Sequence, residues 1–178
     1  INGLTLGGVG TGTELHHIEV IANQDDGVEF FGGTAQIHHV VTAFCGDDSY
    51  DYDEGFRGKG QYWFTVQEPG TGNRGGEHDG GTSPEDGQPY ADPVIYNATY
   101  IGGDISDNNH ALKIRDNGGG KYYNSIFFNW GEGIEIENSS SAPENSYDRF
   151  QAGDLELGNN VFWNVKVSGN SATASDIF

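Results

Sequence analysis

The residues of this sequence that could do chemistry are concentrated in two acidic phrases, Asp25-Asp26 and Asp47-Asp48, which are related by a 22-residue offset. If these phrases stack on neighbouring strands, their carboxylates lie about 5 Å apart and repel each other by about 3 kcal/mol per ionised pair. A hard cation with oxygen ligands would offset this repulsion, and calcium tolerates such irregular ligand sets. We therefore expect a calcium site whose ligands are Asp25, Asp26, Asp47, Asp48, Asp51 and Asp53.

Two other interpretations of these acids stay open. An aspartate at a turn can accept backbone N–H bonds from the next coil and needs no metal. Coupled carboxylates can also hold a proton because their pKa values rise. The spacing does not match the twelve-residue calcium loop of helix-loop-helix proteins.

Two basic residues, Arg57 and Lys59, follow the acids directly. In a calcium-dependent polysaccharide lyase the cation neutralises a uronate carboxylate, and a basic side chain such as theirs takes the adjacent proton. A glycoside hydrolase would instead use paired carboxylates as acid and base. The alternative is that both cations only neutralise Asp53 and Glu54 at the surface. Catalysis is left open, with the candidate residues Asp47, Asp48, Asp51, Asp53, Arg57 and Lys59.

Histidines and aromatic residues supply the remaining candidates. His16-His17 and His38-His39 are related by the same offset, so they can form a stacked polar ladder or bind zinc or copper. Tyr62, Trp63 and Phe64 are consecutive, so at least one of them must point outward. An outward ring can stack on a sugar, which makes Tyr62 and Trp63 the predicted carbohydrate-binding residues unless a loop covers them.

Short strands must position these residues. Runs such as Val28-Glu29-Phe30 alternate apolar and polar residues and are bounded by Gly, Asn or Asp, and no window keeps a helical period for three turns. The many aromatic residues (Phe 10, Tyr 9 and Trp 3) argue against disorder despite a net charge of -19. The chain is therefore predicted to be nearly all β.

A 22-residue offset relates the strands to one another. It places Ile18 on Val40 and Val28 on Tyr50, and it recurs downstream for Leu112 and Ile134. A repeat of this length with Gly, Asn and Asp corners indicates one turn of a solenoid. The predicted inward ladders are Ile18/Val40, Val28/Tyr50 and Phe30/Tyr52, and the outward ladders are Glu29/Asp51 and Lys113/Glu135.

The phrases Asp25-Asp26-Gly27-Val28-Glu29-Phe30-Phe31-Gly32-Gly33-Thr34 and Gly46-Asp47-Asp48-Ser49-Tyr50-Asp51-Tyr52-Asp53-Glu54-Gly55 carry a family resemblance. They resemble secreted right-handed parallel β-helix proteins of the pectate-lyase-like superfamily, and within it surface lipoproteins of bacteria. The resemblance runs from Ile1 to the neighbourhood of Gly103. It implies a right-handed parallel β-helix and a location outside the cell or at its surface, and it implies little about activity. Because such relatives have more coils before this segment, it also suggests a piece of a longer chain.

The predicted organisation is a parallel β-helix over residues 1–167, with inserted loops at 68–93 and 138–151, and a tail or linker at 168–178. The net charge of -19 opposes nucleic acid and anionic membranes. No apolar run is long enough to span a membrane, and the single cysteine, Cys45, excludes an internal disulfide.

Three functions are consistent with these observations. The first is an extracellular non-catalytic surface module that binds divalent cations and glycans. The second is a calcium-dependent polysaccharide lyase or glycoside hydrolase acting on acidic polysaccharide. The third is an element that associates end to end into fibres, because uncapped strand edges can pair with another copy.

Overall fold

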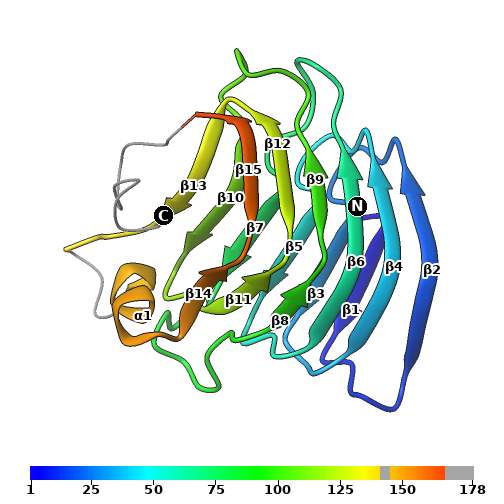
Figure 1. Cartoon of the computed structure of the whole chain (residues 1–178). Helices are drawn as coiled ribbons and strands as arrows, with labels where there is room; N and C mark the ends of the chain where they lie inside the picture. Colours follow the sequence, from blue (N-terminus) through cyan, green and yellow to red (C-terminus); the bar gives the residue numbers. More distant parts are fainter. Residues whose placement is uncertain (141–144, 167–178) are drawn as a thin grey trace.

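The structure is a computed structural model that describes residues 1–140 and 145–166. The predicted tail at 168–178 and part of the predicted second loop lie outside the described residues. The strands of the described residues form two parallel sheets, one behind the other in Figure 1. Sheet A has six strands in the order β1 (Leu4–Gly7), β3 (Val28–Phe31), β5 (Tyr50–Asp53), β7 (Gly76–Asp79), β10 (His110–Arg115) and β13 (Glu132–Ile136).

Sheet B begins with three long strands and continues with pairs of short ones. The long strands are β2 (Glu14–Ile21), β4 (Gln36–Ala43) and β6 (Lys59–Val66). The first half of β6 pairs with β8 and its second half with β9, so two rows of short strands follow. One row is β8 (Val94–Tyr96), β11 (Gly120–Tyr123) and β14 (Leu155–Gly158), and the other is β9 (Thr99–Ile101), β12 (Ile126–Trp130) and β15 (Val161–Val165).

The parallel register confirms the predicted ladders. Val28 pairs with Tyr50 and Phe30 with Tyr52, while Ile18 pairs with Val40 on the other sheet. The outward pairs Glu29/Asp51 and Lys113/Glu135 are also in register. The offset is longer between the paired residues Glu77 and Lys113, because inserted segments lengthen that connection.

The core between the sheets is a stack of aromatic rings. Tyr50 stacks on Trp63 at 4.7 Å, and Phe30 stacks on Phe56 at 4.3 Å. The buried polar atoms of these rings have partners, since the Tyr50 hydroxyl lies 2.8 Å from the Val40 carbonyl oxygen. Contacts between like residues of neighbouring coils also occur, since Phe127 and Phe162 pair in register and their rings stack at 5.0 Å.

A row of residues with positive φ crosses the middle of sheet B. The φ values lie between 53° and 58°, and the residues are His17, His39, Tyr62, Asn97, Asn124 and Asn159. Asn adopts this left-handed conformation at low cost, which explains why an Asn begins each recurring phrase in the later coils. The turn at this row separates β8 from β9, β11 from β12 and β14 from β15.

The predicted loop at 68–93 is wrong in its middle part, because residues Gly76–Asp79 form β7 between β5 and β10. The strand has no apolar side chain, yet His78 fills the core position and stacks on Tyr52 at 3.9 Å. Gly76 allows this packing, since a Cβ atom there would lie 2.5 Å from the His78 ring. The strand was missed because a histidine takes the place of an apolar core residue.

The second predicted loop, 138–151, leads into a short helix, α1 (Ser146–Ala152), which lies beside β14 in Figure 1. The Asn145 side chain caps it by accepting the N–H of Tyr147 at 3.1 Å, and Gly153 ends it at a φ of 84°. Within the described part of the chain, no helix has the length and hydropathy to cross a membrane.

Candidate functional site

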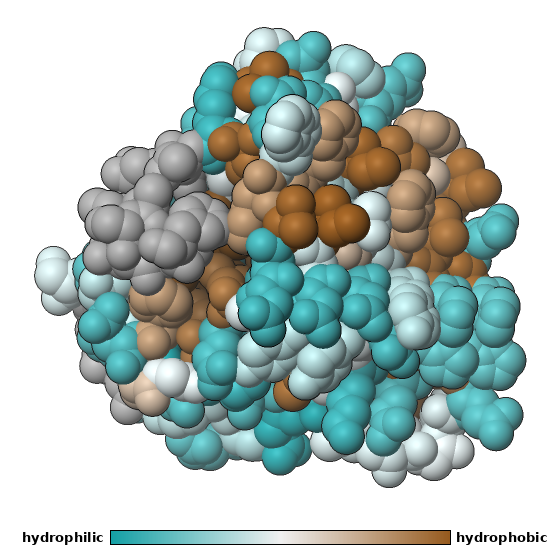
Figure 2. All heavy atoms as spheres, in the orientation of Figure 1, coloured by the Kyte–Doolittle hydropathy of each residue, from teal (hydrophilic) through white to brown (hydrophobic). Residues whose placement is uncertain are grey.

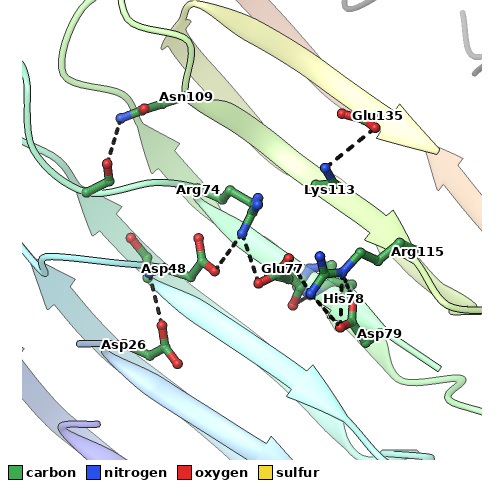
Figure 3. Close-up of polar contacts among 12 residues, drawn as sticks. Asp26, Asp48, Arg74, Glu77, His78, Asp79, Asn109, Lys113, Arg115 and Glu135 are labelled. Carbon is green, nitrogen blue, oxygen red and sulfur yellow. Dashed lines mark hydrogen bonds and ion pairs between the residues drawn. The ribbon is translucent and has the colours of Figure 1, made fainter. Parts of the chain in front are cut away.

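The outward face of sheet A carries ionisable side chains in rows that run across the strands. Because the strands are parallel and in register, side chains at equivalent positions stand next to one another. The central row is Glu29, Asp51, Glu77, Lys113 and Glu135. The rows on either side are Asp26, Asp48, Arg74 and His110, and Asp53, Asp79 and Arg115. Most of these residues are drawn in Figure 3.

Two arginines bridge Asp48, which lies just before β5, and the acids of β7 (Figure 3). Arg74 Nη1 lies 3.1 Å from Asp48 Oδ2 and 2.8 Å from Glu77 Oε2. Arg115 Nη2 lies 3.0 Å from Glu77 Oε1, and Arg115 Nε lies 3.0 Å from Asp79 Oδ1. Arg115 Nε also lies 3.8 Å from Asp116 Oδ2, so four carboxylates share two guanidinium groups. Acidic side chains therefore outnumber basic ones here, and the acids of the neighbouring strands add to the excess of negative charge.

Two aspartate oxygens in this group, Asp48 Oδ1 and Asp51 Oδ1, are buried and have no hydrogen-bond partner among the described residues. The Asp48 side chain is only 2% exposed. One ligand atom from each of Asp48, Asp51 and Glu77 lies within 4.8 Å of the other two, and we call these residues the acid trio. Two oxygens that each bind one calcium ion at about 2.4 Å are at most about 4.8 Å apart. The all-oxygen set and its spacing therefore fit a hard divalent cation.

The pKa values of the surrounding acids are raised. Burial, with Asp26 and Asp48 near by, raises the pKa of Asp51 to about 10. Burial raises the pKa of Asp48 as well, despite the neighbouring Arg74. It also raises the pKa of Glu29 to about 7, and that of Asp79 to about 7 although Arg115 opposes the shift. Without a cation, the protein can keep these groups buried only at the cost of holding protons on them.

Asp26 shows features of two interpretations from the sequence, the metal-free turn and the carboxyl with a raised pKa. Its Oδ1 accepts the backbone N–H of Asp48 at 3.0 Å, which is the metal-free hydrogen bond expected at a coil corner. Burial nevertheless raises its pKa to about 6. An oxygen of Asp26 lies within 4.8 Å of ligand oxygens of Asp25 and Asp47, and Asp25 also pairs with the amino group of Ile1 at 2.8 Å.

The structure links five of the six predicted ligands through overlapping groups and leaves Asp53 out. Asp25, Asp26 and Asp47 form one group, Asp26 and Asp51 form a second with Glu29, and Asp48 and Asp51 form the third with Glu77. The Asp53 carboxylate at the end of β5 instead accepts the Thr82 hydroxyl at 3.0 Å. The predicted ligands therefore lie along a chain of small groups and do not surround one point.

Arg57 and Lys59 do not pair with the acids as predicted. Lys59 begins β6 of sheet B, and neither residue forms an ion pair with any residue of the described ranges. Arg74 and Arg115 take the expected place beside the acids. The chain turns into the second sheet after Gly55, so nearness in sequence does not become nearness in space.

The prediction for Trp63 as a glycan-stacking residue is wrong. Trp63 is 1% exposed, and its Nε1 donates to the Ile37 carbonyl at 3.2 Å. Tyr62 is 46% exposed, which confirms that one residue of the aromatic run points outward. The positive φ of Tyr62 sets this order, because it turns the strand between Gln61 and Trp63.

Sequence reasoning missed Glu77, Asp79 and their two arginines, although a signal was present. The phrase Glu77-His78-Asp79-Gly80-Gly81 repeats the pattern of Glu29-Phe30-Phe31-Gly32-Gly33, in which a glutamate precedes a glycine pair at the same spacing. The two glutamates are separated by two coils, and Asp51 lies in register between them.

Comparison with known proteins agrees with this architecture. A family described as "Pectate-lyase like beta helix domain" matches residues 1–178. No curated protein and no solved structure matches the chain. The predicted parallel β-helix fold and superfamily are thereby confirmed, together with the parallel sheets described above.

Proposed function

Since the chain belongs to the family of pectate-lyase-like β-helix domains, we propose that it is a non-catalytic extracellular module that binds a divalent cation, calcium first, and through it an acidic polysaccharide. The observation that carries the proposal is the pair of buried, unpartnered oxygens, Asp48 Oδ1 and Asp51 Oδ1, on the outward face of sheet A. Buried carboxylate oxygens without partners are rare because their desolvation is uncompensated.

The acid trio would hold the cation, which supplies positive charge where the protein has an excess of negative charge. Arg74 and Arg115 flank the trio and fix its geometry, since each pairs with Glu77 and with at least one further acid. The two arginines therefore keep the central carboxylate in place whether or not the cation is bound.

The charge of the whole chain supports a cation-dependent mode of glycan binding. A protein with a net charge of -19 repels a polyuronate chain at long range. A cation on sheet A, beside Lys113 and Arg115 on the neighbouring strand β10, would give a uronate carboxylate a direct partner of opposite charge. Neutral glycans have no carboxylate and would gain nothing from this contact.

The experiment is a binding titration of the full chain with a polyuronate and with a neutral glucan, in calcium and in excess chelator. We expect binding to the polyuronate in calcium alone, and its loss in Asp51→Asn. Asp53→Asn is the matched control on the same strand and should bind like the wild type. Equal binding in chelator, or equal binding by both variants and the wild type, would refute the proposal.

A second candidate function is polysaccharide cleavage, and one observation favours it. Glu29 and Asp79 have pKa values of about 7, which suits proton transfer near neutral pH. Release of unsaturated or reducing ends from a polyuronate, with loss in Asp79→Asn, would support a lyase or hydrolase. No release across acidic and neutral polysaccharides would leave the non-catalytic function.

The proposal also covers the handedness of the β-helix and the association of one copy with another. A right-handed solenoid is proposed because connections between parallel strands of one sheet are almost always right-handed. Among the described strands, β1 and β2 pair on one side only, so a second copy could add to these edges and form fibres. Light scattering that shows monodisperse monomers at high protein concentration would contradict the assembly.

A further inference from the structure

Four histidines stand together on the outward face of sheet B, on β2 and β4. His16 pairs in register with His38, and their rings stack at 5.3 Å with 16° between the planes. The rings of His17 and His39 stack at 4.8 Å with 3° between the planes. We call His16, His17, His38 and His39 the histidine quartet. Hydrophilic side chains run in a row across this face, and hydrophobic side chains gather above the row (Figure 2).

The backbone explains why neighbouring histidines share one face. In a regular strand, consecutive side chains point to opposite sides. His17 and His39 have φ values of 53° and 55°, so the strand turns there and both members of each pair remain accessible. The later coils use Asn at this position, where the left-handed conformation costs little. Histidine, like Asn, is enriched in this conformation, so the turn accommodates either residue, and in β2 and β4 it places two imidazole rings side by side.

The distances between ring nitrogens suit a metal ion. The Nδ1 atoms of His16 and His17 lie 3.0 Å apart, and those of His38 and His39 lie 2.8 Å apart. Two imidazole nitrogens bound at about 2.0 Å from one ion, at right angles, are about 2.8 Å apart. Across the coils, ring nitrogens of His17, His38 and His39 all lie within 4.8 Å of one another. Two nitrogens on opposite sides of one ion lie about 4.2 Å apart. The accessible rings therefore need to move only slightly toward one another to reach this distance.

We propose that the histidine quartet binds one divalent transition-metal ion of the copper or zinc type through the imidazole nitrogens of His17, His38 and His39. Nitrogen ligands select these ions over calcium, and the near-right-angle spacing within each pair favours the tetragonal geometry of copper(II). Glu19 lines the same open depression as His17 and His39. This site lies on the opposite sheet from the acid trio and does not depend on the proposed function.

Asparagine offers a substitution that removes a ligand and keeps the backbone. His39→Asn and His17→Asn place at the turn the residue that the later coils already use. Tyr62→Asn is the matched control, because Tyr62 occupies the next position of the same row and packs on the His39 ring without offering a ring nitrogen.

The test is calorimetric titration of the chelator-treated chain with copper(II) and, separately, with zinc, in the presence of calcium. We expect one saturable site, weakened by at least about tenfold in His39→Asn, since loss of even an outer partner of a metal ligand costs about 10- to 100-fold. The copper(II) paramagnetic resonance spectrum should show nitrogen splitting that weakens in the double variant of His17 and His39. Tyr62→Asn should bind like the wild type.

Three results would overturn the proposal. The first is an affinity unchanged in both histidine variants, which would assign the rings to a hydrogen-bonded ladder. The second is an equal loss in Tyr62→Asn, which would assign the effect to the backbone. The third is displacement of the metal by calcium, which would move the binding to carboxylates.

Discussion

Replacing Asp51 by asparagine should stabilise the metal-free protein at neutral pH. The pKa of Asp51 is about 10 in the folded protein, against an ordinary value of 3.8. A raised folded pKa contributes stability that is fully present below about pH 4 and is lost as the pH rises toward 10. At 1.36 kcal/mol per pH unit, the loss for this one group reaches about 5 kcal/mol at most by pH 7.5. Asparagine has the same shape as aspartate and carries no charge, so the stability of the variant does not fall with pH for this reason.

The assay is urea unfolding of wild type and Asp51→Asn in excess chelator at pH 4 and pH 7.5. We expect the free energy of unfolding of the variant, relative to that of the wild type, to rise by several kcal/mol from pH 4 to pH 7.5. Asp53→Asn, on the same strand and outside the acid trio, is the matched control for the substitution itself. Calcium at 100 times its dissociation constant should then stabilise the wild type by about 2.7 kcal/mol and the variant much less. An equal difference between variant and wild type at both pH values would refute the reasoning.

Three further predictions concern the fold and its charges. Trp63→Ala should lower the free energy of unfolding by about 3 to 5 kcal/mol, because it empties a buried ring stack, whereas Tyr62→Ala at the surface should cost about 1 kcal/mol or less. Asn124→Ala should cost about 1 to 2 kcal/mol by forcing alanine into the left-handed conformation, and Asn124→Gly should be nearly neutral; equal costs would contradict this origin. Arg115→Gln should lower the free energy of unfolding by about 1 to 3 kcal/mol at pH 8 and by less at pH 5. The reason is that the Asp79 carboxyl, with its pKa of about 7, is protonated at pH 5 and no longer pairs with the arginine. A loss of stability that does not depend on pH would contradict the ion pair.

The register of the fold could be predicted from the sequence because each coil repeats its side-chain types. Val28 and Tyr50 share an apolar core position, while Glu29 and Asp51 share an outward acidic one, and the strands pair accordingly. The Asn phrases that begin at Asn97, Asn124 and Asn159 mark one structural position, the left-handed turn of sheet B. At these residues the preference of each side chain for its position matches the position that the fold gives it.

The prediction failed where a residue took an unusual role. β7 has a histidine in the core and no apolar side chain, so its pattern resembles a loop. The arginines that bridge the acids, Arg74 and Arg115, belong to later coils than Asp48, and no local spacing indicates them. The outward position of Tyr62 and the inward position of Trp63 depend on one backbone turn that alternation alone does not predict.

The most direct test of the cation site is the number of protons released when calcium binds. Burial raises the pKa of Asp51 to about 10, so we expect this carboxyl to hold a proton in the metal-free protein at pH 7.5, and burial raises the pKa of Asp48 as well. A cation must displace the bound protons in order to bind both groups. Calorimetric titration in buffers of different ionisation enthalpy measures this release. We expect one calcium ion to bind with a net release of protons, and both binding and release to fall in Asp51→Asn. Absence of calcium binding, or binding without proton release, would contradict the assignment of the acid trio.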